Sequence, residues 1–433
     1  MAQEHGAARG STTWRGRLLV LVGLLVVAFT LRTAVTSVPP LTTAIGQDIA
    51  LPSWLIGVLG MLPTALFGLA GLLTPLLMRA WSVEAIAVTA MAASGLGQVV
   101  RAVAPETGTF LAGSALALAG MGAGNVVLPP MVKKYFPDRI GLVTALYVTI
   151  ISLGTTIPPL VAVPVADAAG WRASVGWWAA VNVVAILPWL SVWPRRRGRT
   201  TQSGTQGEGG SAPRPRVVVR PWRAPAAWAL ALLFGCSSLN TYTMFGWLPS
   251  ILTGAGLSAA DAGFQLALFS GIGLPLSLVV PVLAARLRNP FPIVAFGVVC
   301  FAAGYAGLWL APGSATWVWT TLAGLGPATF PLALVLVNLR TRTHQSSGAV
   351  SGFGQGIGYI VACAGPLPAG LLHDATGGWD ATFAFLGATL VVLAVSGWVI
   401  SRPHFIDDHP RVVEPVAEPA SSQRGFGSRA PRR

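Results

Sequence analysis

Charged residues are scarce in this sequence, and acidic residues are the scarcest. Asp, Glu, Lys and Arg together make up 10% of the 433 residues, whereas they make up about 25% of an average soluble domain. Hydrophobic residues make up 53% of the chain. This composition excludes a soluble globular domain and predicts that most of the chain lies within a lipid bilayer.

Cysteine and histidine are also scarce, and the common catalytic motifs are missing. Cys236, Cys300 and Cys363 fall inside apolar segments, at spacings that fit neither a disulfide framework nor a metal site. The five His residues lie in the tails or at segment ends. The sequence contains no Ser–His–Asp set, no Walker-type glycine loop and no HExxH motif. We therefore expect no enzyme activity, no metal and no other cofactor.

Long apolar stretches recur along the whole chain. A helix needs about 20 such residues to cross a hydrocarbon core of about 30 Å. The first stretch is too long for a cleavable signal, whose apolar core has roughly 7–15 residues. We therefore predict an all-α integral membrane protein with twelve transmembrane helices, at 18–45, 54–78, 84–103, 107–132, 141–166, 173–193, 226–252, 262–285, 291–311, 316–339, 348–372 and 380–400.

The net charge of +14 is distributed unevenly about these segments. If the N-terminus is cytoplasmic, only Arg101, at the outer end of its segment, and Arg172 are assigned to outer loops, and only Arg32 falls deep inside a segment. All other Lys and Arg residues lie on the cytoplasmic side, as the positive-inside rule requires. The excess charge thus indicates topology and attraction to anionic lipid head groups, not nucleic-acid binding. We expect a multi-pass protein of the inner membrane with both termini in the cytoplasm.

A basic stretch rich in Gly, Ser and Thr interrupts the apolar pattern in the middle of the chain and divides it into two halves. The tail after Arg402 is rich in Pro and Arg. The predicted organisation is a cytoplasmic tail (1–17), a six-helix bundle (18–193), a flexible linker (194–225), a second six-helix bundle (226–400) and a disordered cytoplasmic tail (401–433).

The two halves repeat each other. Three residues of the fifth segment recur in the eleventh at a constant offset of 207 residues, namely Gly141, Pro159 and Asp167 as Gly348, Pro366 and Asp374. Parallel repeats of six spans, with a site near the midplane between them, are typical of major facilitator transporters.

Five stretches extend this likeness over both halves: LRTAVTSVPPL at 31–41, GMGAGNVVLPPMVKKYFPDRIGLVTALY at 120–147, GWLPSILTGAGLSAADAG at 246–263, GLGPATFPLAL at 324–334 and SGFGQGIGYIVACAGPLPAGLLHDATGGW at 351–379. On these stretches the chain resembles the cyanate/nitroimidazole permease (CynX/NimT-type) family of the major facilitator superfamily. The resemblance implies two pseudo-symmetric six-helix bundles and a substrate that is a cyanate-like anion or a nitroimidazole-like small aromatic. One departure is LTPLLMRAW at 73–81, which lacks the acidic residue that the superfamily usually has in this loop.

Arg32 is the strongest candidate for a binding residue. A cation at the bilayer centre costs about 2.5–3.5 kcal/mol on insertion scales, and the interiors of the apolar segments contain no Asp or Glu to offset it. Thr36 lies one turn further along, on the same helix face, and the adjacent Pro39-Pro40 pair frees upstream carbonyls. Arg32 therefore either binds a small planar anion with its guanidinium fork or is held by carbonyls of a neighbouring helix.

Other polar residues inside the segments either line the same site or bond neighbouring helices. Aligning Pro40 with Pro249 places Tyr242 opposite the Arg32 region. The candidates are Asn125 and Tyr147 in the first half, and Asn240, Tyr242, Gln355 and Tyr359 in the second. Between the fourth and fifth segments, Asp138 and Arg139 are either a cytoplasmic gate that pairs with nearby Arg residues or part of a solvated loop.

These observations predict a monomeric secondary transporter that works by alternating access on a small molecule. Because no carboxylate or imidazole is expected in the bilayer core, any proton coupling would be indirect. Two alternatives stay open, namely efflux of small aromatic compounds and a membrane sensor or scaffold without flux.

Overall fold

The computed structural model describes residues 14–192, 217–408 and 412–415; the N-terminal tail before Trp14, most of the predicted linker and the end of the C-terminal tail lie outside these ranges. The first half contains α1 (Trp14–Thr30), α2 (Thr33–Thr36), η1 (Pro39–Leu41), α3 (Thr42–Asp48), α4 (Ser53–Leu77), α5 (Val83–Ala102), α6 (Thr107–Tyr135), α7 (Ile140–Gly176) and α8 (Trp178–Val192).

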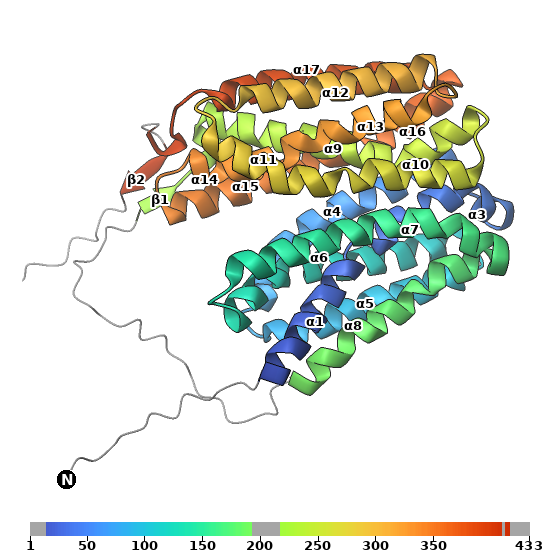
Figure 1. Ribbon diagram of the computed structural model, residues 1–433, viewed down its shortest axis with the longest axis horizontal. Helices are drawn as coiled ribbons and strands as arrows, with labels where there is room; N and C mark the ends of the chain where they lie inside the picture. Colours follow the sequence, from blue (N-terminus) through green and yellow to red (C-terminus); the bar gives the residue numbers. More distant parts are fainter. Residues whose placement is uncertain (1–13, 193–216, 409–411, 416–433) are drawn as a thin grey trace, which may run out of the picture.

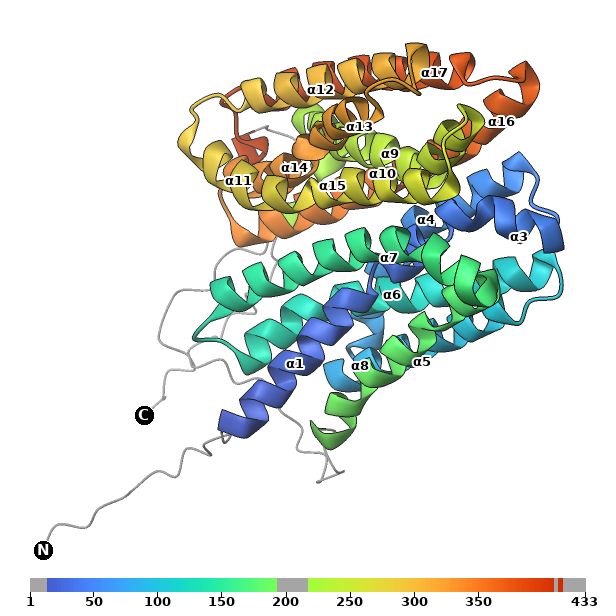
Figure 2. The ribbon, with the colours of Figure 1, turned by 45° about the vertical axis from the view of Figure 1, so that its right-hand side comes forward.

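The second half begins with β1 (Val217–Val219), η2 (Pro221–Arg223), α9 (Pro225–Gly254), α10 (Ala259–Gly271), α11 (Gly273–Arg286) and α12 (Phe291–Leu310). It continues with α13 (Thr316–Leu325), η3 (Gly326–Ala328), α14 (Thr329–Leu339), α15 (His344–Cys363), α16 (Pro366–Thr376), α17 (Asp380–Ser401), η4 (Ile406–Asp408) and β2 (Val413–Pro415). The two halves form two helical bundles that lie side by side (Figures 1 and 2).

The predicted all-α membrane fold is confirmed. Ten helical stretches among the described residues are long and apolar enough to cross a membrane. The remaining two predicted spans fall short for different reasons. The helix α8 is apolar but has 15 residues. The helix α9 has 30 residues but carries a polar run, Ser237, Ser238, Asn240, Thr241 and Thr243.

Glycine and proline set the breaks within the predicted spans. The first span is not one helix and is divided into α1, α2, η1 and α3. Pro39 and Pro40 lack amide donors, which ends the regular bonding after α2. In α7 the chain turns at Gly170, whose φ of 82° is strained for a residue with a side chain. Gly377 makes the matching turn in the second half, with φ 69°.

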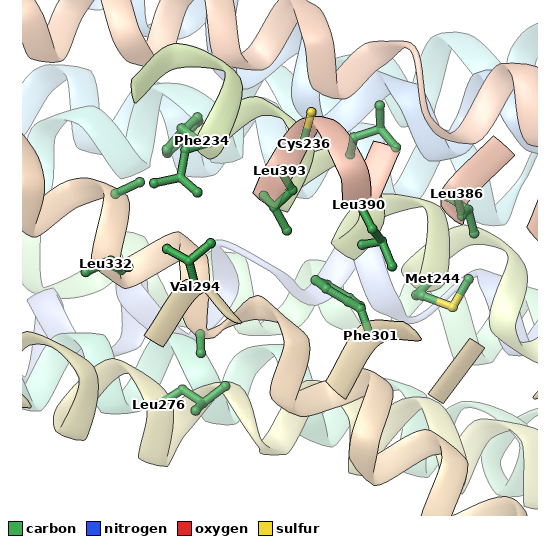
Figure 3. Packing of buried hydrophobic residues seen from close by; sticks show 14 of the residues in the cluster. Phe234, Cys236, Met244, Leu276, Val294, Phe301, Leu332, Leu386, Leu390 and Leu393 are labelled. Carbon is green, nitrogen blue, oxygen red and sulfur yellow. The ribbon is translucent and has the colours of Figure 1, made fainter. Parts of the chain in front are cut away.

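The second bundle has a continuous apolar core, into which α9, α11, α12, α14 and α17 all contribute side chains (Figure 3). Phe301 and Met244 are fully buried there. The other buried apolar residues form smaller clusters, two centred in the first bundle and one that also includes Tyr242 of α9.

Small residues allow the two halves to touch. On α4, a Cβ at Gly57 would lie 2.9 Å from the Leu367 Cα and the Pro366 carbonyl oxygen, and a Cβ at Gly60 would lie 2.8 Å from the Pro366 Cβ. The Trp247 indole donates a hydrogen bond of 2.8 Å to the same Pro366 carbonyl. We call the end at which α1 begins and α8 ends the linker end, and the opposite end, where these contacts gather, the far end (Figure 1).

A second contact between the halves joins α7 and α10. A Cβ at Gly263 would lie 2.7 Å from the Pro159 carbonyl oxygen. Towards the linker end the glycines are not in close contact. A Cβ at Gly141 of α7, or at Gly348 or Gly352 of α15, would meet no atom within 4 Å. The halves are thus packed tightly near the far end and leave open space along these helices near the linker end.

The start of the predicted disordered tail differs from expectation. The strand β2 pairs antiparallel with β1, Ile406 and Val412 are buried at 1% and 0% exposure, and the Ile406 amide donates to the Arg340 carbonyl. Arg342 binds Asp408 through two hydrogen bonds of 2.9 and 3.0 Å, which lowers the pKa of the Asp408 carboxyl. Ile406 and Val412 thus hold the chain after α17 against the second bundle. The sequence analysis did not identify them, because the tail as a whole is rich in Pro and Arg.

The close approach at Gly57 can be tested by substitution. We expect Gly57→Val to lower the free energy of unfolding by about 1–3 kcal/mol, because the added side chain meets the backbone of α16. Gly71→Val is the matched control on the same helix, where a Cβ meets nothing within 4 Å. Thermal unfolding in detergent measures both, and equal losses would show that the inter-half contact is not the constraint.

Candidate functional site

Arg32 lies in the break between α1 and α2. Its backbone is not helical (φ −126°, ψ −7°), and its guanidinium carbon lies 4.6 Å from the centre of the Phe67 ring of α4, within cation–π range. The side chain is half-buried, yet its Nη1 atom is buried without a hydrogen-bond partner among the described residues. A buried donor of this kind leaves room for an acceptor from a ligand or from water.

Next to Arg32 along α2, the chain borders an enclosed cavity of about 30 Å³ between the two halves. This volume is enough for one or two water molecules. Ala34, Val35 and Pro39 of the first half face Tyr242 and Phe245 of α9 across it. Tyr242 is 6% exposed, so the structure brings this predicted residue to the boundary between the halves.

The sequence analysis assigned Arg101 to an outer loop, and the structure shows that this assignment is wrong. Arg101 lies in the last turn of α5, its side chain is 2% exposed, and it lines the same cavity. Its Nη1 has only long contacts, 3.4 Å to the Ala34 carbonyl and 3.5 Å to Gln98 Oε1, and its Nε has no partner. The glycines Gly97 and Gly113 let α5 and α6 pack closely enough to cover it.

The sequence did carry a signal for Arg101. Ser94, Gln98 and Arg101 are spaced by four and three residues, so they share one face of an otherwise apolar helix. All three are buried, and each has a side-chain polar atom without a partner among the described residues. A polar stripe of this kind on an apolar helix indicates a functional residue. It is a better guide to the role of Arg101 than the residue's position near the predicted end of the helix.

Tyr359 and Gln355 lie on α15, near a recess of about 540 Å³ between α15 and α4. Tyr359 lines this recess and packs edge-on against Phe234 at 5.3 Å. Gln355 is half-buried and donates a hydrogen bond of 2.8 Å to Ser351 Oγ. Tyr359 also packs against the cluster that contains Phe67 and Tyr242, which brings it to the same region as Arg32.

Thr36 and Asn240 use their polar groups inside the protein. The Thr36 hydroxyl donates to the Thr155 carbonyl of α7 at 2.9 Å. The Asn240 amide donates to the Cys236 carbonyl and to Thr389 Oγ1, and its oxygen accepts from the Tyr305 hydroxyl at 2.9 Å. These bonds join neighbouring helices, and neither residue lines the enclosed cavity.

Asn125 on α6 and Tyr147 on α7 are half-buried. Tyr147 packs against the apolar cluster of α1, α6 and α8. The Asn125 amide forms no hydrogen bond within the described part of the chain. The Tyr147 hydroxyl likewise forms none there, so both residues have polar atoms free for a ligand.

At the linker end, Asp138 lies 3.6 Å from Arg17 Nη1 of α1 and 3.9 Å from Arg139 Nε. All three side chains are about half exposed, and all belong to the first bundle, so the pair does not connect the two halves. A buried carboxylate that the sequence analysis missed lies nearby. Glu84, at the start of α5, accepts hydrogen bonds of 2.6 Å from Lys134 and Tyr135, and was overlooked because it sits at a segment boundary.

The fold and this interior site define a polytopic membrane transporter. Residues 20–366 match the Major Facilitator Superfamily, and the chain belongs to this family. Its curated relatives include the uncharacterized transporter YycB of Bacillus subtilis (strain 168), 30% identical over 89% of this chain and 94% of the relative. The 2-nitroimidazole transporter of Escherichia coli (strain K12) is 29% identical, over 90% and 98%.

The cyanate transport protein CynX of Escherichia coli (strain K12) is 27% identical over 87% of this chain and 94% of its own length. Among solved structures, a bacterial homologue of the human lysosomal transporter Spinster, in an inward-facing and occupied conformation, aligns with a TM-score of 0.68 at 15% identity. The alignment covers 90% of this chain and 97% of that one. These matches confirm the predicted superfamily and fold and show that the protein is a transporter rather than an enzyme.

The bonding of Asn240 predicts a structural role. We expect Asn240→Ala to lower the free energy of unfolding by about 1–3 kcal/mol, because it leaves the buried Tyr305 hydroxyl unpaired, while the KM for uptake changes little. Asn125→Ala is the control, since it removes an unbonded amide and should change stability by less than about 0.5 kcal/mol. Thermal unfolding and uptake assays measure the two effects, and the reverse pattern would assign Asn240 to the substrate site.

Proposed function

We propose that this transporter moves a small anion or a small polar planar solute across the inner membrane by alternating access, with both termini in the cytoplasm. The observation that carries this proposal is the Arg32 guanidinium, which lies against the Phe67 ring and has a buried donor without an acceptor. A planar solute can stack near aromatic rings and accept hydrogen bonds from the guanidinium fork. The names of two relatives, for cyanate and 2-nitroimidazole, are consistent with this substrate class.

The packing of the halves supports the transport mechanism. Contacts between α4 and α16 and between α7 and α10 close the far end, whereas glycines of α7 and α15 near the linker end face open space. This arrangement fits a state open towards the linker end. Rocking of one bundle against the other would separate Gly57 and Gly60 from Pro366 and expose the cavity at the far end.

In this proposal Tyr242, Tyr359, Gln355 and Asn125 shape the pocket around Arg32, and Asp138 and Arg139 bias the linker-end gate without bridging the halves. Efflux of small aromatic compounds is a second candidate, because Tyr242 and Phe245 form an aromatic wall of the enclosed cavity. Transport in vesicles of both orientations, with cyanate and 2-nitroimidazole as probes, separates uptake from efflux.

Arg32 is the residue on which the proposal is tested. A charge-assisted hydrogen bond contributes about 1.5–3 kcal/mol, so we expect Arg32→Leu to raise the KM for cyanate roughly ten- to hundredfold. Arg32→Lys should give a smaller rise, because it keeps the charge and loses the planar fork. The measurement is uptake of labelled cyanate into proteoliposomes.

Arg79→Lys, an exposed change in the loop between α4 and α5, is the control and should leave uptake unchanged. Thermal unfolding of each variant separates recognition from folding. If Arg32→Leu transports cyanate with the parental KM, or loses uptake only because it unfolds, Arg32 does not bind the substrate.

A further inference from the structure

Arg101 is the buried charge that the proposed function does not use. Among the described residues, neither Arg101 nor Arg32 forms an ion pair, and both belong to the first bundle. Asp48 pairs with Arg172, and Glu84 pairs with Lys134. Glu106, five residues after Arg101, is exposed and forms no ion pair in the described part of the chain. The two guanidiniums therefore lie in a low-dielectric interior without counter-charge.

The two guanidiniums lie at different depths. The residues of α4 that line the enclosed cavity with Arg101 run from Ile56 to Pro63, whereas Arg32 lies over Phe67, one turn closer to the linker end. Four residues of helix correspond to about 6 Å along the axis. Arg101 reaches the cavity from the far end, since it lies in the last turn of α5 and contacts the Ala34 carbonyl.

The cavity at Arg101 is built to hold a small anion. The Arg101 side chain is only 2% exposed. Its Nε has no hydrogen-bond partner, and its Nη1 makes only contacts of 3.4 Å or longer. Ser114 of α6 lines the same cavity beside it, and Tyr242 of α9 lines it from the other half. In low-dielectric surroundings an unpaired charge attracts an anion more strongly than it attracts a neutral ring.

We propose that Arg101 is a second anion-binding residue, and that the transported anion passes from Arg32 at the linker side to Arg101 in the enclosed cavity between α2, α5, α6 and α9. This inference rests on the proposed function and narrows it, because two successive guanidinium sites select an anion over a neutral aromatic solute. The cavity of about 30 Å³ limits the occupant in this conformation to an anion of a few atoms. A linear or planar triatomic anion such as cyanate meets this limit most closely.

The test places a fixed counter-charge beside Arg101. In Ser114→Asp the new carboxylate neutralises the guanidinium from within the cavity, so we expect the affinity for cyanate to fall at least tenfold while the melting temperature is kept or raised. Ser114→Asn is the matched control, since it has nearly the same shape as the Asp variant without the charge, and Ser114→Asp should bind cyanate at least tenfold more weakly than Ser114→Asn. Binding to the purified full-length protein is measured by calorimetry, with 2-nitroimidazole as a second probe whose affinity the carboxylate should affect less.

Equal cyanate affinity in Ser114→Asp and Ser114→Asn would overturn the role of Arg101. If the parent itself binds no cyanate by calorimetry and Arg32→Leu transports normally, the proposed function fails, which is distinguishable from failure at Arg101 alone.

A measurement on the parent protein covers the case in which Ser114→Asp does not fold. Selenocyanate carries a selenium atom with an anomalous signal, so a crystal soaked in it should show a peak in the cavity between Arg101 and Tyr242. A peak at Arg32 alone would leave the first site and remove the second. Arg101→Lys gives a further check, because a retained charge should preserve part of the cyanate affinity, whereas Arg101→Gln should abolish it.

Discussion

The structure depends on positive charge held in the interior of the first bundle, without a carboxylate among the described residues to pair with it. Arg32 and Arg101 both lie in the first bundle, and each has a buried donor atom without a partner among the described residues. A buried charge is tolerated where aromatic faces, carbonyl groups or a mobile anion offset its desolvation. Phe67 lies under Arg32 and Phe110 lies 5.4 Å from the Arg101 guanidinium. These rings offset part of the cost and leave the donors free, which is the condition that a transient ligand requires.

The break in the first span contributes to the same condition, namely a buried Arg32 donor that stays free. If the span from α1 to α3 were one helix, the Arg32 backbone would be fully bonded and its side chain would follow a regular helical position. Instead Pro39 and Pro40 end the regular bonding, Arg32 leaves the helical conformation, and Thr36 ties the short helix α2 to the Thr155 carbonyl of α7. Irregular backbone at this depth is stable because it is enclosed by protein, and it brings Ala34 to Arg101.

Much of this could be predicted from sequence, and the remainder could not, for identifiable reasons. The spans, the repeat and the superfamily follow from long apolar runs and from recurring Gly, Pro and Asp residues. Arg32 stands out because its whole neighbourhood is uncharged. Arg101 does not, because it lies at a segment end where a loop and a helix look alike, and only the close packing at Gly97 and Gly113 buries it. Asn240 looks like a binding residue in the sequence, because it is a polar residue in an apolar segment. Two of its three hydrogen bonds, however, join α9 to α12 and α17, and partners so distant in sequence cannot be identified without the fold.

The two bundles contribute unlike chemistry to the boundary between them. The first supplies the guanidiniums, and the second supplies Tyr242, Phe245 and Tyr359 from helices with a continuous core. Asn240 lies two residues before Tyr242 and is bonded to α12 and α17, so α9 is anchored to its own bundle and carries Tyr242 with it as a rigid element. Rigid-body motion of one bundle against the other would therefore change the position of the aromatic wall relative to the fixed charges. In such a device the first half sets which solute is attracted, and the second half sets which end of the path the solute can leave.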